Sequence, residues 1–282
     1  MDALKASYRG SSSDEEDDIV STAPSDLSPP PPPPSLPPPP LSLLDFPNSI
    51  SALHDLPIAQ PTRFRSFPHV EGNYALHVYI PVYIPTTSKK EVVLFLKKVS
   101  SLVPSLHLVD IDVPLTSLCK DEHKLEQALA REFHISLSRT VPIRVHQIDS
   151  IVSMLRQKLQ CQRRYWIDFS KWETFVNDDL SRTFLSMEII AGGLMEIRKQ
   201  IQVVNEVYKF HNLPEFYKEE RPHISLAWAL GDLSKLLSRV VDDKMKRSSM
   251  APSKRCIFTT KFSGIECKIG KKTYKICKSP DE

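Results

Sequence analysis

A His-Ile-Ser-Leu tetrapeptide occurs twice in this chain of 282 residues, headed once by His134 and once by His223. Both copies lie in stretches where apolar and polar residues alternate, which is typical of a β-strand with one buried face. Alternate side chains of a strand share a face, so His134 points the same way as Ser136, and His223 the same way as Ser225. The isoleucine and leucine of each copy point to the opposite face, into a core.

If the two strands are neighbours or pseudo-symmetric mates, the two His-Ser pairs converge on one cleft. Such a cleft has the groups needed to split a phosphodiester. One neutral imidazole takes a proton from a hydroxyl nucleophile and one imidazolium gives a proton to the leaving oxygen. The serine hydroxyls donate hydrogen bonds to the non-bridging oxygens. No cluster of carboxylates accompanies the histidines, so we expect neither a metal ion nor another cofactor.

A structural alternative stays open at this point. Each histidine could cap a strand, and each serine could satisfy a backbone group. A lone H-x-S tripeptide favours that interpretation, whereas two copies on alternating strands favour a shared site. Zinc binding fits the pattern poorly, because a His-Ser pair on a strand offers one good ligand only.

Charge and proline divide the chain into two regions. Residues 1–61 carry two basic and nine acidic residues, a net charge of −7, and hold most of the 24 prolines. This composition predicts a disordered acidic and proline-rich tail, which is either a spacer or a ligand for an SH3- or WW-type partner. Residues 62–282 carry 35 basic and 25 acidic residues, a net charge of +10, which suits a polyanionic partner.

The five cysteines are scattered and form no C-x-x-C pair, which favours a reducing compartment over a disulfide framework. The N-terminus shows no signal peptide, and no apolar run reaches the ~18 residues that a membrane span needs. We therefore expect no membrane partner, and we expect a monomer.

The hydrophobic spacing of residues 62–282 predicts an α+β fold. Its order of helix, strand with histidine, helix, strand with histidine suggests two pseudo-symmetric lobes, each an antiparallel sheet with helices, flanking a central cleft. The expected strands are 73–82, 106–109, 133–138, 165–169, 174–176, 184–190, 222–230 and a terminal meander of 256–262, 264–269 and 273–277. The expected helices are 89–102, 122–133, 149–159, 194–210 and 233–241.

Other conspicuous residues have mainly structural interpretations. His69 and His77 lack a paired serine, which favours a structural role for both. The three tryptophans fit packing in the core or at its rim better than stacking on bases. Basic residues at 244–247 and 254–255 fit a nuclear signal, phosphate contacts or a solvated helix end.

Paired H-x-[ST] strands 89 positions apart resemble those of the two-histidine (2H) phosphoesterase superfamily. The flanking residues resemble the U6 small nuclear RNA phosphodiesterase family over roughly residues 63–278. The segments that carry this resemblance are 65–69, 72–81, 133–138, 181–184, 216–217, 222–228 and 231–232.

The resemblance implies a nuclear 3′-to-5′ exoribonuclease that trims the uridine-rich tail of U6 RNA by transesterification and leaves a 2′,3′-cyclic phosphate, which some members open. It implies that His134 and His223 are catalytic and that Ser136 and Ser225 bind phosphate. It further implies that Tyr217 stacks on a base, that Asp178 makes a polar substrate contact, and that Arg221 and Pro222 line the base pocket through their backbone.

Two other functions remain open at this stage. One is a phosphodiesterase that acts on 2′,3′-cyclic RNA ends. The other is a non-catalytic RNA-binding or spliceosomal scaffold that uses the same cleft, although a binding module has no need of a paired acid and base.

Overall fold

The computed structural model describes residues 67, 70–247 and 256–278. The chain divides into two units, Met1–Ile58 and Ala59–Glu282, and every described residue belongs to the second. The predicted tail, the basic pair at 254–255 and His69 lie outside the described residues. None of the described helices is long and apolar enough to cross a membrane.

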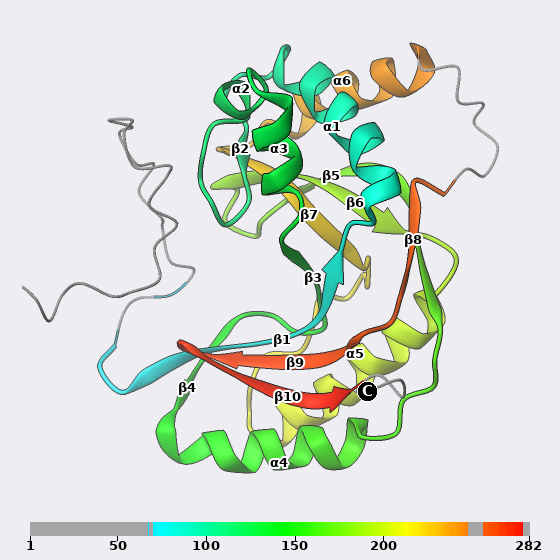
Figure 1. The fold of residues 1–282 in the computed structure, drawn as a ribbon. Helices are drawn as coiled ribbons and strands as arrows, with labels where there is room; N and C mark the ends of the chain where they lie inside the picture. Colours follow the sequence, from blue (N-terminus) through cyan, green and yellow to red (C-terminus); the bar gives the residue numbers. More distant parts are fainter. Residues whose placement is uncertain (1–66, 68–69, 248–255, 279–282) are drawn as a thin grey trace, which may run out of the picture. The chain divides into compact units, whose positions relative to one another are not determined.

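Ten strands form two antiparallel five-stranded sheets, as predicted for an α+β fold with two lobes (Figure 1). The first sheet has the order β10-β9-β1-β3, with β4 also paired to β1. Its strands are β1 (Asn73–Tyr83), β3 (Glu132–Ser136), β4 (Val141–Arg144), β9 (Gly264–Ile269) and β10 (Lys272–Lys278). The second sheet has the order β2-β7-β6-β5-β8. Its strands are β2 (His107–Leu108), β5 (Trp166–Val176), β6 (Arg182–Ile189), β7 (His223–Leu230) and β8 (Phe258–Lys261).

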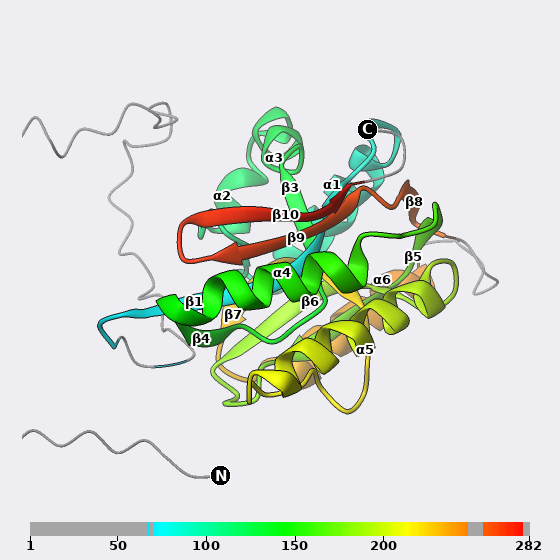
Figure 2. The same cartoon turned by 90° about the horizontal axis from the view of Figure 1, so that it is seen from below.

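Two of the helices follow a strand of one sheet but pack on the side of the other sheet. Helices α4 (Ile148–Leu159) and α5 (Leu194–Phe210) lie side by side against the first sheet, although α5 follows β6 of the second (Figure 2). Helix α1 (Thr86–Ser100) follows β1 of the first sheet and packs near the second, with α2 (Leu115–Leu118), α3 (Glu122–Ala128) and α6 (Ser234–Arg247). The short 3₁₀ helix η2 (Val145–Gln147) precedes α4. Neither lobe is therefore built from one continuous piece of chain.

Strand β1 has one buried face from Leu76 onward, whereas Tyr74 near its start is 41% exposed. Leu76, Val78, Ile80 and Val82 are each at most 2% exposed and belong to the hydrophobic core. Burying one such side chain contributes about 1.5–3 kcal/mol, so this face alone holds the strand firmly. The other face of β1 carries His77 and Tyr79.

The predicted terminal meander is wrong. Strand β8 pairs with β5 in the second sheet, whereas β9 and β10 form a hairpin that joins β1 in the first. The chain crosses from one lobe to the other between β8 and β9, where the Ser263 hydroxyl donates to the carbonyl of Pro81. Alternation indicates which face of a strand is buried, but it does not identify the strand that pairs with it.

Other differences are local. The two strands predicted at 165–169 and 174–176 are one strand, β5, because a register shift between Phe169 and Lys171 interrupts its alternation. The helix predicted at 122–133 ends at Ala128, and β3 begins at Glu132. The short elements β4 and α2 were not predicted, since four residues carry too little periodicity to recognise.

Candidate active site

The two motif strands, β3 and β7, run beside each other where the two sheets meet (Figure 1). His134 and Ser136 lie on β3, and His223 and Ser225 on β7, each half-buried between fully buried apolar neighbours. The structure thus brings together the two His-Ser pairs that strand alternation predicted. The imidazoles are close enough that charge on His134 contributes to lowering the pKa of His223.

A third histidine belongs to the site. The His77 ring lies 5.2 Å from that of His134, edge to face, and its Nε2 is 3.0 Å from Oγ of Ser136. His77 thus contacts both members of the first motif, and its structural role stays a prediction. Burial, with smaller effects from His134 and Lys268, lowers the pKa of His77 to about 3. His77 is neutral near pH 7 and serves as a hydrogen-bond partner of Ser136.

His223 is held in one orientation. Its Nδ1 lies 2.7 Å from the carbonyl oxygen of Arg221, which can only accept, so Nδ1 carries the hydrogen and Nε2 is left for proton transfer. Phe175 of β5 stacks on the imidazole with ring centroids 3.9 Å apart and planes 14° apart. The ring therefore has little freedom to turn or flip.

The backbone that orients His223 is itself clamped. The Arg221 guanidinium donates to both carboxylate oxygens of Glu188, at 2.6 and 2.7 Å, and to Glu173 at 2.9 Å. Glu188 is 6% exposed and pairs with His223 across the β6–β7 ladder. Hydrogen bonds to Glu188 raise the pKa of Arg221 above its ordinary value. This clamp, formed by Arg221, Glu173 and Glu188, fixes the backbone at the start of β7 and thereby holds His223 in place.

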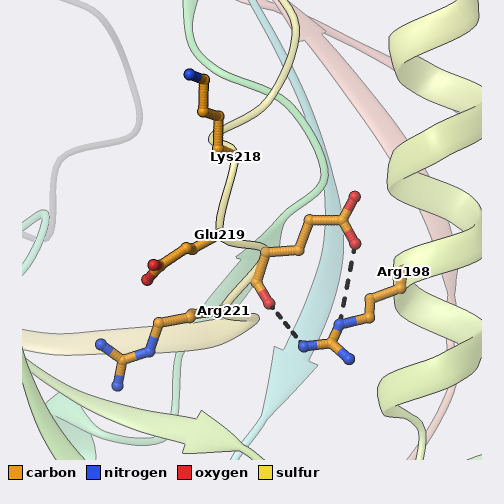
Figure 3. A pocket seen from close by; sticks show the side chains of 5 residues that line it. Arg198, Lys218, Glu219 and Arg221 are labelled. Carbon is orange, nitrogen blue, oxygen red and sulfur yellow. Dashed lines mark hydrogen bonds and ion pairs between the residues drawn. The ribbon is translucent and has the colours of Figure 1, made fainter.

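The loop before β7 is anchored a second time, from α5. Arg198 donates to the Glu220 carbonyl oxygen at 3.3 Å and forms an ion pair of 3.9 Å with its carboxylate (Figure 3). These residues line a cavity of about 450 Å³, together with Lys218, Glu219 and Arg221. The carbonyl of Pro222 accepts from Ile189 N–H at 2.9 Å. The structure thus shows positioning contacts for Arg221 and Pro222, and their contact with a substrate stays a prediction.

The motif serines differ in their neighbours. Oγ of Ser225 is 3.1 Å from Oγ of the buried Ser186 on β6, and Ser136 has His77. Ser138 lies two residues past Ser136, beyond the end of β3; it is buried, and its Oγ accepts from Val78 N–H at 2.9 Å. Ser138 is a structural residue, whereas Ser136 and Ser225 keep hydroxyl capacity for a ligand.

Tyr217 and Asp178 are linked by a residue that the sequence did not single out. The Arg139 guanidinium forms an ion pair with Asp178 and lies 4.2 Å from the centre of the Tyr217 ring. Tyr217 is 46% exposed, so its ring remains accessible. Arg139 follows the end of β3, so Asp178 and Tyr217 meet it beside that strand. The stacking of a base on Tyr217 remains a prediction.

Burial lowers the pKa of both motif histidines. For His134, a rise from Asp110 and further lowering by Lys268 and Arg131 are smaller effects. For His223, the bond to the Arg221 carbonyl and the charge of Glu188 partly oppose the effect of burial. In the described ranges, no three His, Cys, Asp or Glu side chains are grouped as metal ligands. Proton transfer between imidazoles and a bound oxygen ester is the chemistry that this arrangement supports.

A histidine and a serine presented by each of two lobes, on strands that lie beside each other, define a site of the two-histidine phosphoesterase class. Residues 37–277 match the HVSL family, whose members are described as uncharacterised conserved proteins. The chain is 30% identical over 223 residues to U6 snRNA phosphodiesterase 1 of Xenopus laevis, covering 76% of this chain and 77% of that protein. The chain belongs to the U6 snRNA phosphodiesterase family.

The other comparisons cover less of this chain. The Danio rerio U6 snRNA phosphodiesterase 1 is 34% identical over 63% of this chain and 56% of its own length. The solved structure of Kluyveromyces marxianus Usb1 with uridine monophosphate has a TM-score of 0.48 and 15% identity, covering 72% of this chain and 97% of that one. The structure of E. coli LigT with 3′-AMP has a TM-score of 0.42 and 10% identity, covering 72% and 93%.

Proposed function

We propose that this protein is a phosphodiesterase acting on RNA, and specifically a 3′-to-5′ exoribonuclease that trims the uridine-rich 3′ end of U6 small nuclear RNA by metal-independent transesterification. Its family relatives bear the name U6 snRNA phosphodiesterase 1. The observation that carries the proposal is the meeting of two His-Ser pairs on the adjoining strands β3 and β7. Acid, base and phosphate-binding hydroxyls are all supplied by this pair of strands.

The reaction uses the RNA's own hydroxyl. The 2′-oxygen of the penultimate nucleotide attacks the last phosphorus while one neutral imidazole takes its proton. The bond from phosphorus to the 5′-oxygen of the terminal nucleoside breaks, and the other imidazolium protonates that oxygen. Ser136 and Ser225 donate to the non-bridging oxygens. The products are a nucleoside and a 2′,3′-cyclic phosphate, which water can open to a monophosphate with the two histidine roles reversed.

The same proposal covers the setting of the reaction. We expect it to take place in the nucleus, as part of U6 maturation for splicing, with RNA as the partner and no membrane involved. We expect the protein to act as a monomer. The proline tract is proposed as an SH3- or WW-type ligand or as a spacer.

A direct test uses an oligouridine-tailed RNA incubated with the protein in EDTA, with the products resolved by length and end group. We expect a ladder that shortens from the 3′ end. Activity only on ends that are already cyclic would favour a cyclic phosphodiesterase. Tight binding without cleavage would favour a scaffold, and loss of activity in EDTA alone would contradict the metal-independent mechanism.

The lowered histidine pKa values predict an acidic optimum. The active free enzyme holds one proton on the pair, and its population peaks between the two apparent pKa values. Burial lowers the pKa values of His134 and His223 below the ordinary value of 6.5. The active form is therefore lost as the pH rises through these lowered pKa values. We expect kcat/KM to peak below pH 6.5. A peak at pH 7.5 or above (a limit we set from the ordinary value) would contradict this.

The clamp on His223 gives another prediction. Glu188→Gln removes a charge that raises the pKa of His223 and weakens the hold on Arg221. We expect kcat to fall on the order of tenfold, and one limb of the pH profile to move to lower pH while the other stays. If the acidic limb moves, His223 is the base; if the alkaline limb moves, it is the acid.

The matched control is Glu206→Gln, which removes an ion pair with Lys158 on the helices. Thermal melting of both variants separates an effect on folding from one on catalysis. A drop in kcat for Glu188→Gln with both limbs unmoved would show that the clamp does not act through the His223 charge.

A further inference from the structure

One face of the first sheet is polar beside the catalytic strand. Strand pairing sets Tyr79 of β1 between Ser136 of β3 and Glu266 of β9, and sets His77 opposite Lys268 of β9. Paired residues of antiparallel strands point to the same face, so these side chains all share the face that carries the first motif. The opposite face of the sheet is in the core. The polar face therefore continues the site beyond β3, across β1 to β9.

Lys268 and Lys275 of β10 are exposed cations of this face, and Lys275 lies opposite Glu266. The charge of Lys268 lies close enough to contribute to the lowered pKa of both His77 and His134. The two glutamates on this face accept hydrogen bonds from tyrosines: Glu266 from the Tyr79 hydroxyl at 3.0 Å, and Glu132 from that of Tyr83 at 3.1 Å. Among the described residues, the Lys268 ammonium has neither an ion pair nor a hydrogen bond. Its charge is felt by the two imidazoles and also by Glu132, whose pKa it acts to lower against the effect of burial, but no carboxylate of the described residues lies within ion-pair distance of it.

The strand register separates this charge from the reacting atoms. His134 pairs with Pro81 and Lys268 with His77, a step of four residues along β1, or roughly 13 Å. The two residues also lie on opposite sides of β1, about 4.8 Å away on each side. Lys268 thus lies outside the group that holds the scissile phosphate, but on the same continuous surface.

We propose that Lys268 binds an RNA phosphate upstream of the scissile one, so that the preceding nucleotides run across the β1–β9 face of the first sheet. The inference rests on the proposed function. An enzyme that removes the last nucleoside has one phosphate at its reacting centre, and every other phosphate of the substrate lies on the 5′ side. A cation that lies on this surface outside the reacting centre can therefore meet only an upstream phosphate. Lysine suits this role as a point charge without base preference.

The test compares two substrates that differ in upstream phosphates. The dinucleotide UpU has none, and a short oligouridylate has several. We expect Lys268→Met to lower kcat/KM roughly tenfold more for the oligouridylate than for UpU, and Lys268→Arg to restore most of the difference. The slope of log(kcat/KM) against log[salt] for the oligouridylate becomes shallower by about one contact. Lys199→Met, an exposed lysine on α5, is the matched control and shows neither effect.

Equal losses on both substrates, with an unchanged salt slope, would overturn the inference and leave Lys268 a purely electrostatic neighbour of the imidazoles. Equal activity of Lys268→Met and wild type would overturn it as well. Failure of the wild-type protein to cleave either substrate would count against the proposed function itself and remove the basis for the inference. Thermal melting of Lys268→Met confirms that the variant is folded, and Lys268→Arg keeps the test valid if it is not.

Discussion

Replacing either His134 or His223 with alanine is expected to lower the rate of RNA cleavage by roughly 10²–10⁴-fold, because each removes a proton-transfer group that water replaces poorly. Binding of uncleaved RNA should change far less, since Ser136 and Ser225 keep their hydrogen bonds to the phosphate. The double variant should be little worse than either single one, because residues that act in one proton-transfer cycle are not additive. Single-turnover cleavage and RNA-binding titrations measure the two quantities.

The control is His123→Ala, an exposed histidine on α3 whose Nε2 contacts Gln127. It should leave the cleavage rate unchanged. A single-histidine variant that retained more than about a tenth of the wild-type rate would contradict the assignment of acid and base to this pair.

Replacing Ser136 or Ser225 with alanine is expected to lower kcat by roughly 10²–10³-fold, the usual effect of removing one donor to a developing oxyanion. The structure offers an internal control in Ser138, which follows the end of β3 and accepts from the backbone N–H of Val78. Ser138→Ala should lower the melting temperature, because it leaves a buried N–H without its partner, and should spare kcat. The opposite pattern would mean that the motif serines are structural.

The central part of the site follows from the sequence because strand parity is a local property. Two residues in an H-x-S tripeptide share a face wherever the strand lies, and buried neighbours determine which face is inside. His134 with Ser136, and His223 with Ser225, could therefore be predicted as pairs.

The remainder of the site depends on which strands pair, and parity does not determine that. His77 has no serine in its own strand and acquires one from β3. Glu188 reaches His223 only through the β6–β7 register, and Lys268 reaches the site only because β9 joins β1. Arg139 meets Asp178 and Tyr217 from two distant loops. Long-range contacts of this kind leave no periodic pattern in one sequence.

The claim that the RNA supplies its own nucleophile is tested most directly by removing that nucleophile. The measurement is cleavage, in EDTA, of two oligouridine-tailed RNAs that are identical except for a 2′-deoxy sugar at the penultimate nucleotide. We predict that the all-ribose RNA loses its terminal nucleoside and acquires a 2′,3′-cyclic phosphate, while the deoxy RNA binds and stays intact. Release of the terminal nucleoside from the deoxy RNA at a comparable rate would contradict transesterification, because water would then be the attacking group.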